Sequence, residues 1–244
     1  MTTDPHKNNK NLQISYWTAI GSCIMVGLTQ DYFAPFLLLI GATAFHIGIF
    51  NGLNNLFSSL ALLPSANLSL KFRSRKKVIL FFIFLQILML ILLCVCAAFT
   101  TIKPNLAILI IICFGAFGTI THPGWVSILS DMVAPEIRGS YFGWRARNIG
   151  FITIFVTFVA GFILYFFNTI NPLTGFIFIF TAAFISRLVS FYYTRQMAEP
   201  PLSYNKEDIF SFWKFLVRIK ESNFVRFVLF TAGTNFSVNI ALIL

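Results

Sequence analysis

The sequence predicts an all-α, polytopic membrane protein whose long helices pack into one bundle. Hydrophobic residues make up 57% of the 244-residue chain and charged residues only 11%, whereas a soluble domain needs roughly 25% charged residues to cover its surface. The apolar residues form continuous stretches instead of alternating with polar ones, which favours helices over the strands of a membrane β-barrel. Lipid is therefore the expected solvent for most of the chain.

Seven stretches are long enough to cross a membrane, because about 20 apolar residues in a helix span a hydrocarbon core of about 30 Å. They are Ser15–Ile40, His46–Leu68, Val78–Thr100, Asn105–Ser130, Phe142–Phe167, Pro172–Tyr193 and Phe224–Leu244.

The segments around these stretches predict the domain organisation. Residues 1–14 are expected to form a cytoplasmic tail, residues 15–195 a six-helix transmembrane bundle, and residues 196–223 a cytoplasmic linker with an amphipathic helix. The seventh span, residues 224–244, ends inside a hydrophobic run. We therefore expect a truncated product or a half-molecule, whose partner would be a C-terminal half bundle.

Basic residues predict the orientation. All of the 18 Lys and Arg residues except Lys103 and Arg187 lie in the N-terminal tail or in the second, fourth and sixth connections and their flanks. Basic connections stay in the cytoplasm, so we expect a cell-membrane protein with a cytoplasmic N-terminus. The net charge of +10 then fits an anionic bilayer surface, and no aromatic and basic module for nucleic acid is visible.

Asp31 is the acidic residue that the sequence places within a span, about 24 Å along the first helix from Ser15. Because a charge at this depth costs a few kcal/mol, one interpretation is a cation or proton site, or a substrate contact. The other is an interfacial residue on a helix that begins later. The polar residues around Asp31, with Pro35 after them, also predict a break in the helix.

A polar stripe on the second span is the other candidate for a solvent-filled site. Its residues follow the i, i+3, i+4, i+7, i+8 spacing of one helix face: Asn51, Asn54, Asn55, Ser58 and Ser59. Such a face lines either a wet cavity or a partner helix that it binds by hydrogen bonds. The number of polar residues favours the cavity.

Three further features bear on the interior of the bundle. His122, which with Pro123 interrupts the fourth span, could relay protons or cap the backbone gap that the proline opens. Arg187 is expected to snorkel to the membrane surface from its position near Tyr193. The four cysteines lie in apolar runs, so we expect no disulfide and no metal site.

The basic connections carry a resemblance to a known family. The segment from Asp131 to Gly143 contains Pro135, Arg138 and Gly139, and it resembles the loop between helices four and five of the major facilitator superfamily. The segment 71–77 resembles that family's basic motif between helices two and three, although Leu70 or Ser69 stands at the usual Asp and Ser74 at the usual Gly. Asn223 to Phe227 is similar to the start of the family's seventh helix.

The resemblance implies the N-terminal six-helix half of a secondary active transporter plus helix seven, with a cavity lined by helices one, two, four and five. Helix six would lie at the periphery. It implies a small solute, coupled to protons or another ion, and no cofactor. The cavity residues would be Asp31, Asn51, Asn54, Asn55, Ser58 and His122. The cytoplasmic gate would contain Arg75, Lys76, Lys77, Asp131, Arg138 and Gly139.

Two other functions are weighed against transport. A structural or assembly protein without a cavity would use the polar stripe for helix contacts only. An intramembrane enzyme is disfavoured because the sequence has no Gly-x-Ser-x-Gly or His-Glu-x-x-His motif, and no second intramembrane acid that could pair with Asp31.

Overall fold

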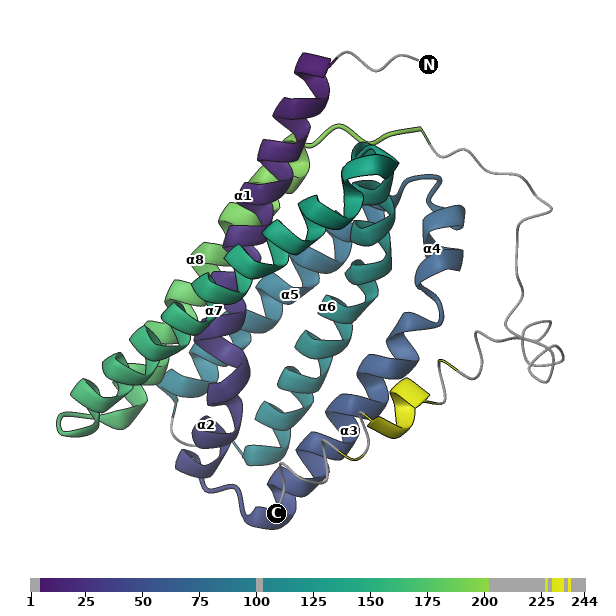
Figure 1. Ribbon diagram of the computed structural model, residues 1–244. Coiled ribbons are helices and arrows are strands. Elements are labelled where there is room, and N and C mark those ends of the chain that lie inside the picture. The colour runs from purple at the N-terminus through teal and green to yellow at the C-terminus, as the bar shows by residue number, and fades with distance from the viewer. Residues whose placement is uncertain (1–4, 100–102, 202–226, 228–229, 235–236, 238–244) are drawn as a thin grey trace, which may run out of the picture. The chain divides into compact units, whose positions relative to one another are not determined.

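The computed structural model describes residues 5–99, 103–201, 227, 230–234 and 237, and it divides the chain into the units Met1–Pro201 and Leu202–Leu244. In the described part every regular element is helical (Figure 1). The elements of the first unit are α1 (Pro5–Thr29), η1 (Gln30–Tyr32), α2 (Phe33–Leu39), α3 (Ala44–Leu62), α4 (Ser65–Lys71), α5 (Arg75–Ala98), α6 (Pro104–Met132), η2 (Pro135–Ile137), α7 (Arg138–Asn168) and α8 (Pro172–Gln196).

The residues predicted to form the six-helix bundle, 15–195, lie within this unit. The predicted linker lies almost wholly outside the described residues, and of the seventh span only residues 227, 230–234 and 237 are described, all as helix. Five helical stretches of the described chain are long and apolar enough to cross a membrane by length and composition. They are Lys10–Leu39, Arg75–Ala98, Pro104–Met132, Pro135–Asn168 and Pro172–Gln196. The polar stripe lowers the hydropathy of α3 and explains why it is not among them.

Proline and polar residues decide where the spans bend. The first span changes from α-helix to a 3-10 turn at Gln30–Tyr32, the break that its polar residues predict. The predicted second span consists of two helices. Helix α3 ends at Leu62 and α4 begins after Pro64, because proline has no amide hydrogen to continue the backbone hydrogen bonds of the helix. The interruption predicted at Pro123 is wrong, since α6 runs through it as a helix.

A glycine makes the turn between α2 and α3 possible. Gly41 has a φ of 93°, a left-handed conformation that costs a residue with a Cβ about 1–2 kcal/mol. The amides of Gly41 and Ala42 donate to the carbonyls of Leu38 and Leu37 over 3.1 and 2.9 Å. This is the Schellman arrangement that ends many helices, and it reverses the chain into α3.

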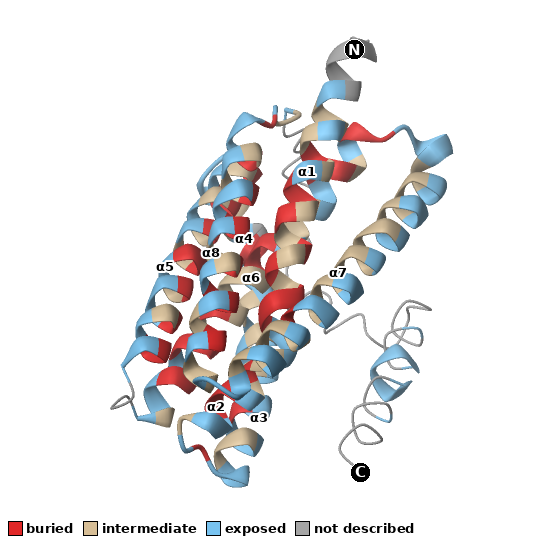
Figure 2. Cartoon of the chain, turned by 90° about the vertical axis from the view of Figure 1, so that its left-hand side faces the viewer, coloured by how far each residue is buried: buried red, intermediate tan, exposed pale blue. Residues whose placement is uncertain are grey.

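The core of the bundle lies between α1, α5, α6 and α8 (Figure 2). Apolar side chains from these helices and from α2 fill it without exposed surface, among them Phe36, Leu37, Ile83, Leu90, Ile111, Ile179 and Phe180. In contrast, α3 packs mainly against α6, and α7 packs against α1 and α8. Both α3 and α7 therefore leave most of their surface uncovered within this unit.

Small residues let α1 and α8 approach closely. A Cβ on Gly21 would lie 2.9 Å from the Ser186 carbonyl oxygen and 3.0 Å from the Ser190 amide nitrogen. The Ser186 hydroxyl donates to the Gly21 carbonyl over 2.6 Å, and the Ser22 and Ser190 hydroxyls are 2.9 Å apart. Such seams of small and hydroxyl-bearing residues are typical of helix pairs in membranes.

We expect Gly21→Ala to destabilise the bundle by about 2 kcal/mol, because overpacking against backbone typically costs 1–3 kcal/mol. Thermal unfolding of the purified protein in detergent micelles measures the change. The control is Gly48→Ala, where the added Cβ meets nothing within 4 Å. Equal melting temperatures for the two variants would contradict the close packing of α1 and α8.

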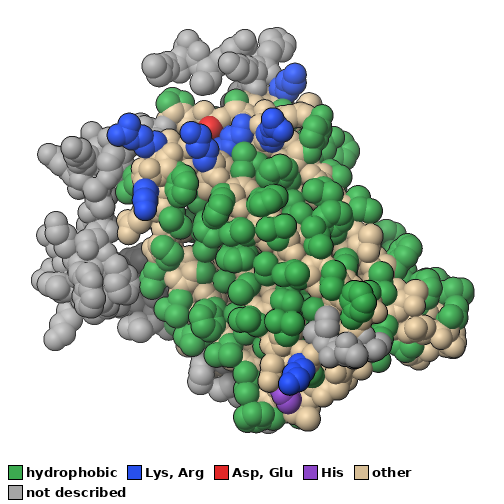
Figure 3. All heavy atoms as spheres, turned by 180° about the vertical axis from the view of Figure 1, so that it is seen from behind, with side chains coloured by type: hydrophobic (Ala, Val, Ile, Leu, Met, Phe, Trp, Pro, Cys, Tyr) green, Lys and Arg blue, Asp and Glu red, His purple; other side chains and the backbone are tan. Residues whose placement is uncertain are grey.

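Basic side chains collect at one end of the bundle, which we call the basic end. Figure 3 shows them above a broad band of hydrophobic side chains. The start of α1, the connections α4–α5 and α6–α7 and the end of α8 all lie there (Figure 1). Its charged residues include Arg73, Arg75, Lys76, Lys77, Arg138 and Arg195. One charged end beside an apolar band is the pattern of a membrane protein with basic loops on one side.

Candidate functional site

Asp31 lies in the 3-10 turn that separates α1 from α2. Its side chain is exposed, and in the described part of the chain it has no hydrogen-bond or ion-pair partner. It borders an open groove of about 640 Å³, which we call the Asp31 groove. The groove is lined by Asp31, Tyr32, Thr153, Ile154, Thr157, Phe158, Gly161, Phe162 and Tyr165, so it lies between the break after α1 and the second half of α7.

The polar stripe of α3 divides into two sets. Asn54 and Ser58 are half-buried against α6, where a Cβ on Gly115 would lie 2.6 Å from Asn54 Oδ1 and 3.5 Å from Ser58 Oγ. Asn51, Asn55 and Ser59 are exposed.

Helix contact and open surface therefore both occur on this stripe, and the glycine of α6 makes room for the first set. The Ser59 hydroxyl donates to the Asn55 carbonyl over 2.8 Å. The Asn51 and Asn55 side chains are exposed, so they can contact solvent or another molecule beside α3.

His122 is exposed on α6, about two turns beyond Gly115 toward the basic end. Within the described residues its ring makes no hydrogen bond, so the interpretation that it caps the backbone gap at Pro123 finds no support. The predicted cavity residues therefore lie in η1 and on α3 and α6, and the Asp31 groove adds residues of α7.

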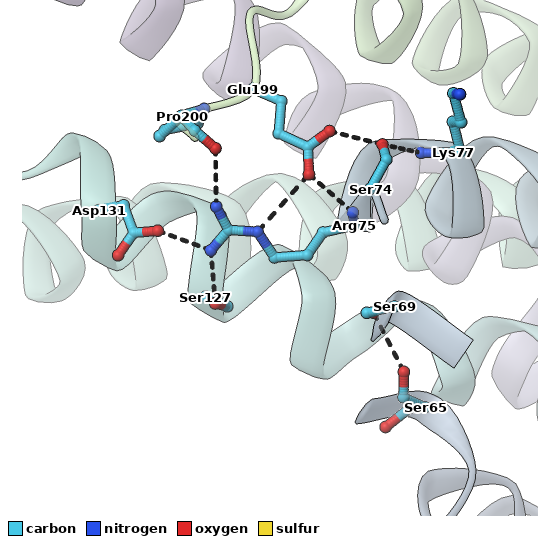
Figure 4. A network of polar contacts seen from close by, with 9 residues as sticks. All are labelled: Ser65, Ser69, Ser74, Arg75, Lys77, Ser127, Asp131, Glu199 and Pro200. Carbon is cyan, nitrogen blue, oxygen red and sulfur yellow. Dashed lines mark hydrogen bonds and ion pairs between the residues drawn. The ribbon is translucent and has the colours of Figure 1, made fainter. Parts of the chain in front are cut away.

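Arg75 is the centre of a polar network at the basic end (Figure 4). Its Nη1 donates to Asp131 Oδ2 over 2.6 Å and to Ser127 Oγ over 2.7 Å. Its Nη2 donates to the Pro200 carbonyl over 3.0 Å. Only 5% of the Arg75 side chain is exposed, against 45% of Asp131. The guanidinium group thus ties the start of α5 to the end of α6 and to the segment after α8.

Glu199 completes this network, and the sequence analysis did not identify it. Its Oε1 accepts from the Arg75 amide over 2.7 Å and lies 3.6 Å from Arg75 Nε, while the Ser74 hydroxyl donates to its Oε2 over 2.5 Å. The available signal was an acid followed by Pro200 and Pro201 directly after the sixth span. Without coordinates nothing indicated that this acid returns to the second connection.

The other predicted gate residues have separate contacts. Arg138 donates from Nη2 to the Ser130 carbonyl over 2.6 Å and from Nε to the Val133 carbonyl over 3.1 Å. It therefore binds the end of α6, where free carbonyls attract a cation. Lys76 donates from Nζ to the carbonyls of Arg195 and Met197.

Lys77 is exposed, and its amide donates to the N-cap hydroxyl of Ser74. Gly139 lies in the first turn of α7 with an ordinary negative φ and open space around it. Neither the backbone conformation nor the packing at this position therefore requires glycine. The left-handed residue at this end is instead Arg73, with a φ of 50°.

Ser74 does not take the left-handed conformation that the family's glycine would suggest. It has extended backbone angles and caps α5 by accepting from the Lys77 amide. The turn before α5 uses Arg73 for the left-handed position, so serine at 74 is compatible with the connection.

Arg187 corrects the prediction of a snorkelling side chain. It is 4% exposed, and its guanidinium group donates to the Ser22 hydroxyl over 2.8 Å and to the Gln86 side-chain carbonyl. Gln86 in turn donates to the Phe114 carbonyl over 2.9 Å. A buried cation with neutral partners thus joins α1, α5, α6 and α8.

The cysteines are all free, and no cluster of three metal-ligating side chains occurs in the region that the structure describes. The described site consists of polar side chains on helices, with the ion pairs concentrated at the basic end.

Comparison with known proteins gives one match. The family model described as Major Facilitator Superfamily matches residues 19–244. No curated protein and no solved structure gives a significant match.

Proposed function

Because the chain belongs to the major facilitator superfamily, as the match over residues 19–244 shows, we propose that it carries a small solute across the cell membrane by alternating access. A multi-pass membrane transporter is what the family establishes. The mechanism, the residues of the path, the coupling to protons or another ion and the cytoplasmic position of the basic end are our proposals.

The observation that carries the proposal is the exposed polar surface on α3. Asn51, Asn55 and Ser59 are uncovered on a helix that packs mainly against α6. Polar groups that face lipid are expensive, because hydrocarbon offers them no hydrogen bonds. This surface therefore borders water, a solute or a second bundle, as the inner face of a transporter half does.

A second bundle would face the helices that this one leaves uncovered. Both α3 and α7 carry exposed side chains. The first packs mainly against α6, which carries His122, and the second packs against α1, which leads into the Asp31 turn. In alternating access two such bundles rock around a site near the middle of the membrane. Asp31 would bind the solute or the coupling ion there.

The Arg75 network would act at the cytoplasmic end. It joins α5 and α6 to the segment after α8, and Asp131 remains half exposed beside it. A second bundle that approached this end could compete for the exposed carboxylate. Closure and opening of the cytoplasmic side would then change the partners of Asp131 while Glu199 held Arg75 in place.

Uptake into sealed vesicles tests the proposal. We expect the complete gene product to take up at least one solute from a radiolabelled panel, and Asp31→Asn to lower that uptake by more than about tenfold. The isosteric amide has no negative charge to attract a cation and does not take up a proton near neutral pH. Asp31→Glu is the control that keeps the charge. Wild-type protein that is folded and inserted but takes up no solute would contradict transport.

A further inference from the structure

The lining of the Asp31 groove carries a negative charge and no positive one. It contains the Asp31 carboxylate and no lysine, arginine or histidine. In the described part of the chain that carboxylate is not neutralised by any ion pair. An anionic ligand would be repelled here, and a neutral apolar ligand that covered the carboxylate would displace its water without replacing the lost hydrogen bonds.

Aromatic rings form the rest of the wall. Phe158, Phe162 and Tyr165 follow each other on one face of α7 at helical spacing, and they are 76%, 70% and 78% exposed. Tyr32 adds a fourth ring from the turn next to Asp31. None of these four rings pairs with another aromatic ring among the described residues. The three α7 rings are exposed to a ligand, whereas Tyr32 is half-buried against the core. Aromatic faces attract cations through the ring quadrupole.

Three of the four hydroxyl groups in the lining of the groove already donate to backbone carbonyls, and the fourth is that of the exposed Tyr165. The Tyr32 hydroxyl donates to the Thr157 carbonyl over 2.5 Å, and Thr157 Oγ1 donates to the Gly27 carbonyl over 3.3 Å. Thr153 Oγ1 donates to the Ile149 carbonyl over 2.9 Å. A sugar or another polyol needs many free hydrogen-bonding groups, and the described lining offers only the Asp31 carboxylate and the Tyr165 hydroxyl.

The same bonds fix the shape of the wall. Tyr32 is tied to α7, and a Cβ on Gly161 would lie 3.0 Å from its hydroxyl, so the glycine leaves room for the ring. A volume of about 640 Å³ lies within the range of small-molecule sites, roughly 300–1,000 Å³.

From this combination we infer that the groove binds an amphipathic organic cation, with its ammonium group at Asp31 and its apolar or aromatic part against Tyr32 and the α7 rings. The inference rests on the proposed transport function and specifies its substrate class. A positive charge, a hydrophobic body and few hydrogen-bonding groups are the three properties that the lining selects.

Equilibrium binding tests the inference. The complete gene product in lipid nanodiscs is titrated with tritiated benzyltrimethylammonium, and its neutral carbon isostere, neopentylbenzene, serves as competitor. We expect saturable binding that the isostere does not displace. Asp31→Asn should weaken it about tenfold or more through loss of the ion pair.

Two ring variants separate the aromatic contribution from general damage. Tyr165→Leu should weaken binding about threefold to fivefold, the size of an exposed cation–π contact. Tyr165→Phe keeps the ring and should bind like the wild type. Thermal unfolding of each variant shows that the loss does not come from an unfolded protein.

Several outcomes would overturn the inference: equal cation binding by the wild type and Asp31→Asn, displacement by the neutral isostere, or no binding at all. If the wild type does not bind the cation and Asp31→Asn lowers the melting temperature, the Asp31 carboxylate stabilises the protein instead, as an ion pair with a basic residue of a second bundle would. Uptake of a neutral or anionic solute in the vesicle assay would then leave transport standing and reject only the cation. Absence of any uptake would reject both.

Discussion

Gln86→Leu should destabilise the bundle by about 3 kcal/mol, although it replaces a polar residue with an apolar one inside a membrane protein. The change removes the carbonyl that accepts from the buried Arg187 guanidinium and the amide that donates to Phe114. Hydrogen bonds to charged groups contribute roughly 1.5–3 kcal/mol, and an unpartnered buried charge costs more than an unpartnered neutral group. The melting temperature of the purified protein measures the loss.

A double-mutant cycle identifies the cause. Arg187→Met removes the charge itself, so Gln86→Leu should be far less harmful in the Arg187→Met background. Replacing a buried polar pair by apolar side chains of similar volume is often neutral, and contacting residues show coupling of about 0.5–3 kcal/mol. Strictly additive effects would mean that Gln86 stabilises the helices by packing alone.

Arg75→Gln is expected to destabilise the basic end by about 2 kcal/mol and to impair transport. It leaves the carboxylates of Asp131 and Glu199 without their cation and removes donors to Ser127 and Pro200. Breaking a fully buried ion pair costs about 3–5 kcal/mol. The smaller figure allows for solvent screening at Asp131, whose side chain is 45% exposed.

Lys77→Gln is the matched control for this variant. It removes the same formal charge from the same turn of α5, but Lys77 is exposed, so its loss should change stability by less than about 0.5 kcal/mol. Arg75→Lys should fall between the two, because lysine keeps the charge and loses the planar fork that reaches several acceptors. Similar losses of stability in Arg75→Gln and Lys77→Gln would contradict a specific role of the network, because they would show that only the total surface charge matters.

The helices of the bundle were predictable because each is a long apolar run, and run length is a local property. The local breaks were predictable only in part. The polar residues around Asp31 indicated one, whereas the end of α3 before Pro64 was hidden inside a stretch whose hydrophobicity continues on both sides. At Pro123 the opposite happened, since the neighbouring turns of α6 hold the helix together.

The partners of charged residues could not be predicted, because they come from different helices. Arg187 is close to the end of its span in sequence, which favours snorkelling, yet it turns inward to Ser22 and Gln86. Glu199 lies in a proline-rich connection, yet it contacts Arg75, at the start of a helix 124 positions earlier in the sequence. The periodicity of the α3 stripe predicted one polar face, but only packing against Gly115 separates Asn54 and Ser58 from the exposed residues.

Labelling of a cysteine at position 55 from each side of the membrane tests the central claim, that α3 borders a path open to alternating sides. The complete gene product is changed to Asn55→Cys after alanine has replaced Cys23, Cys94, Cys96 and Cys113. Sealed vesicles of known orientation are then treated with a membrane-impermeant thiol reagent from inside or from outside. Alternating access predicts labelling from both sides, with a transported solute protecting the thiol. Lack of reaction of Asn55→Cys from either side, while the exposed control Lys77→Cys reacts, would contradict the claim that α3 borders a transport path.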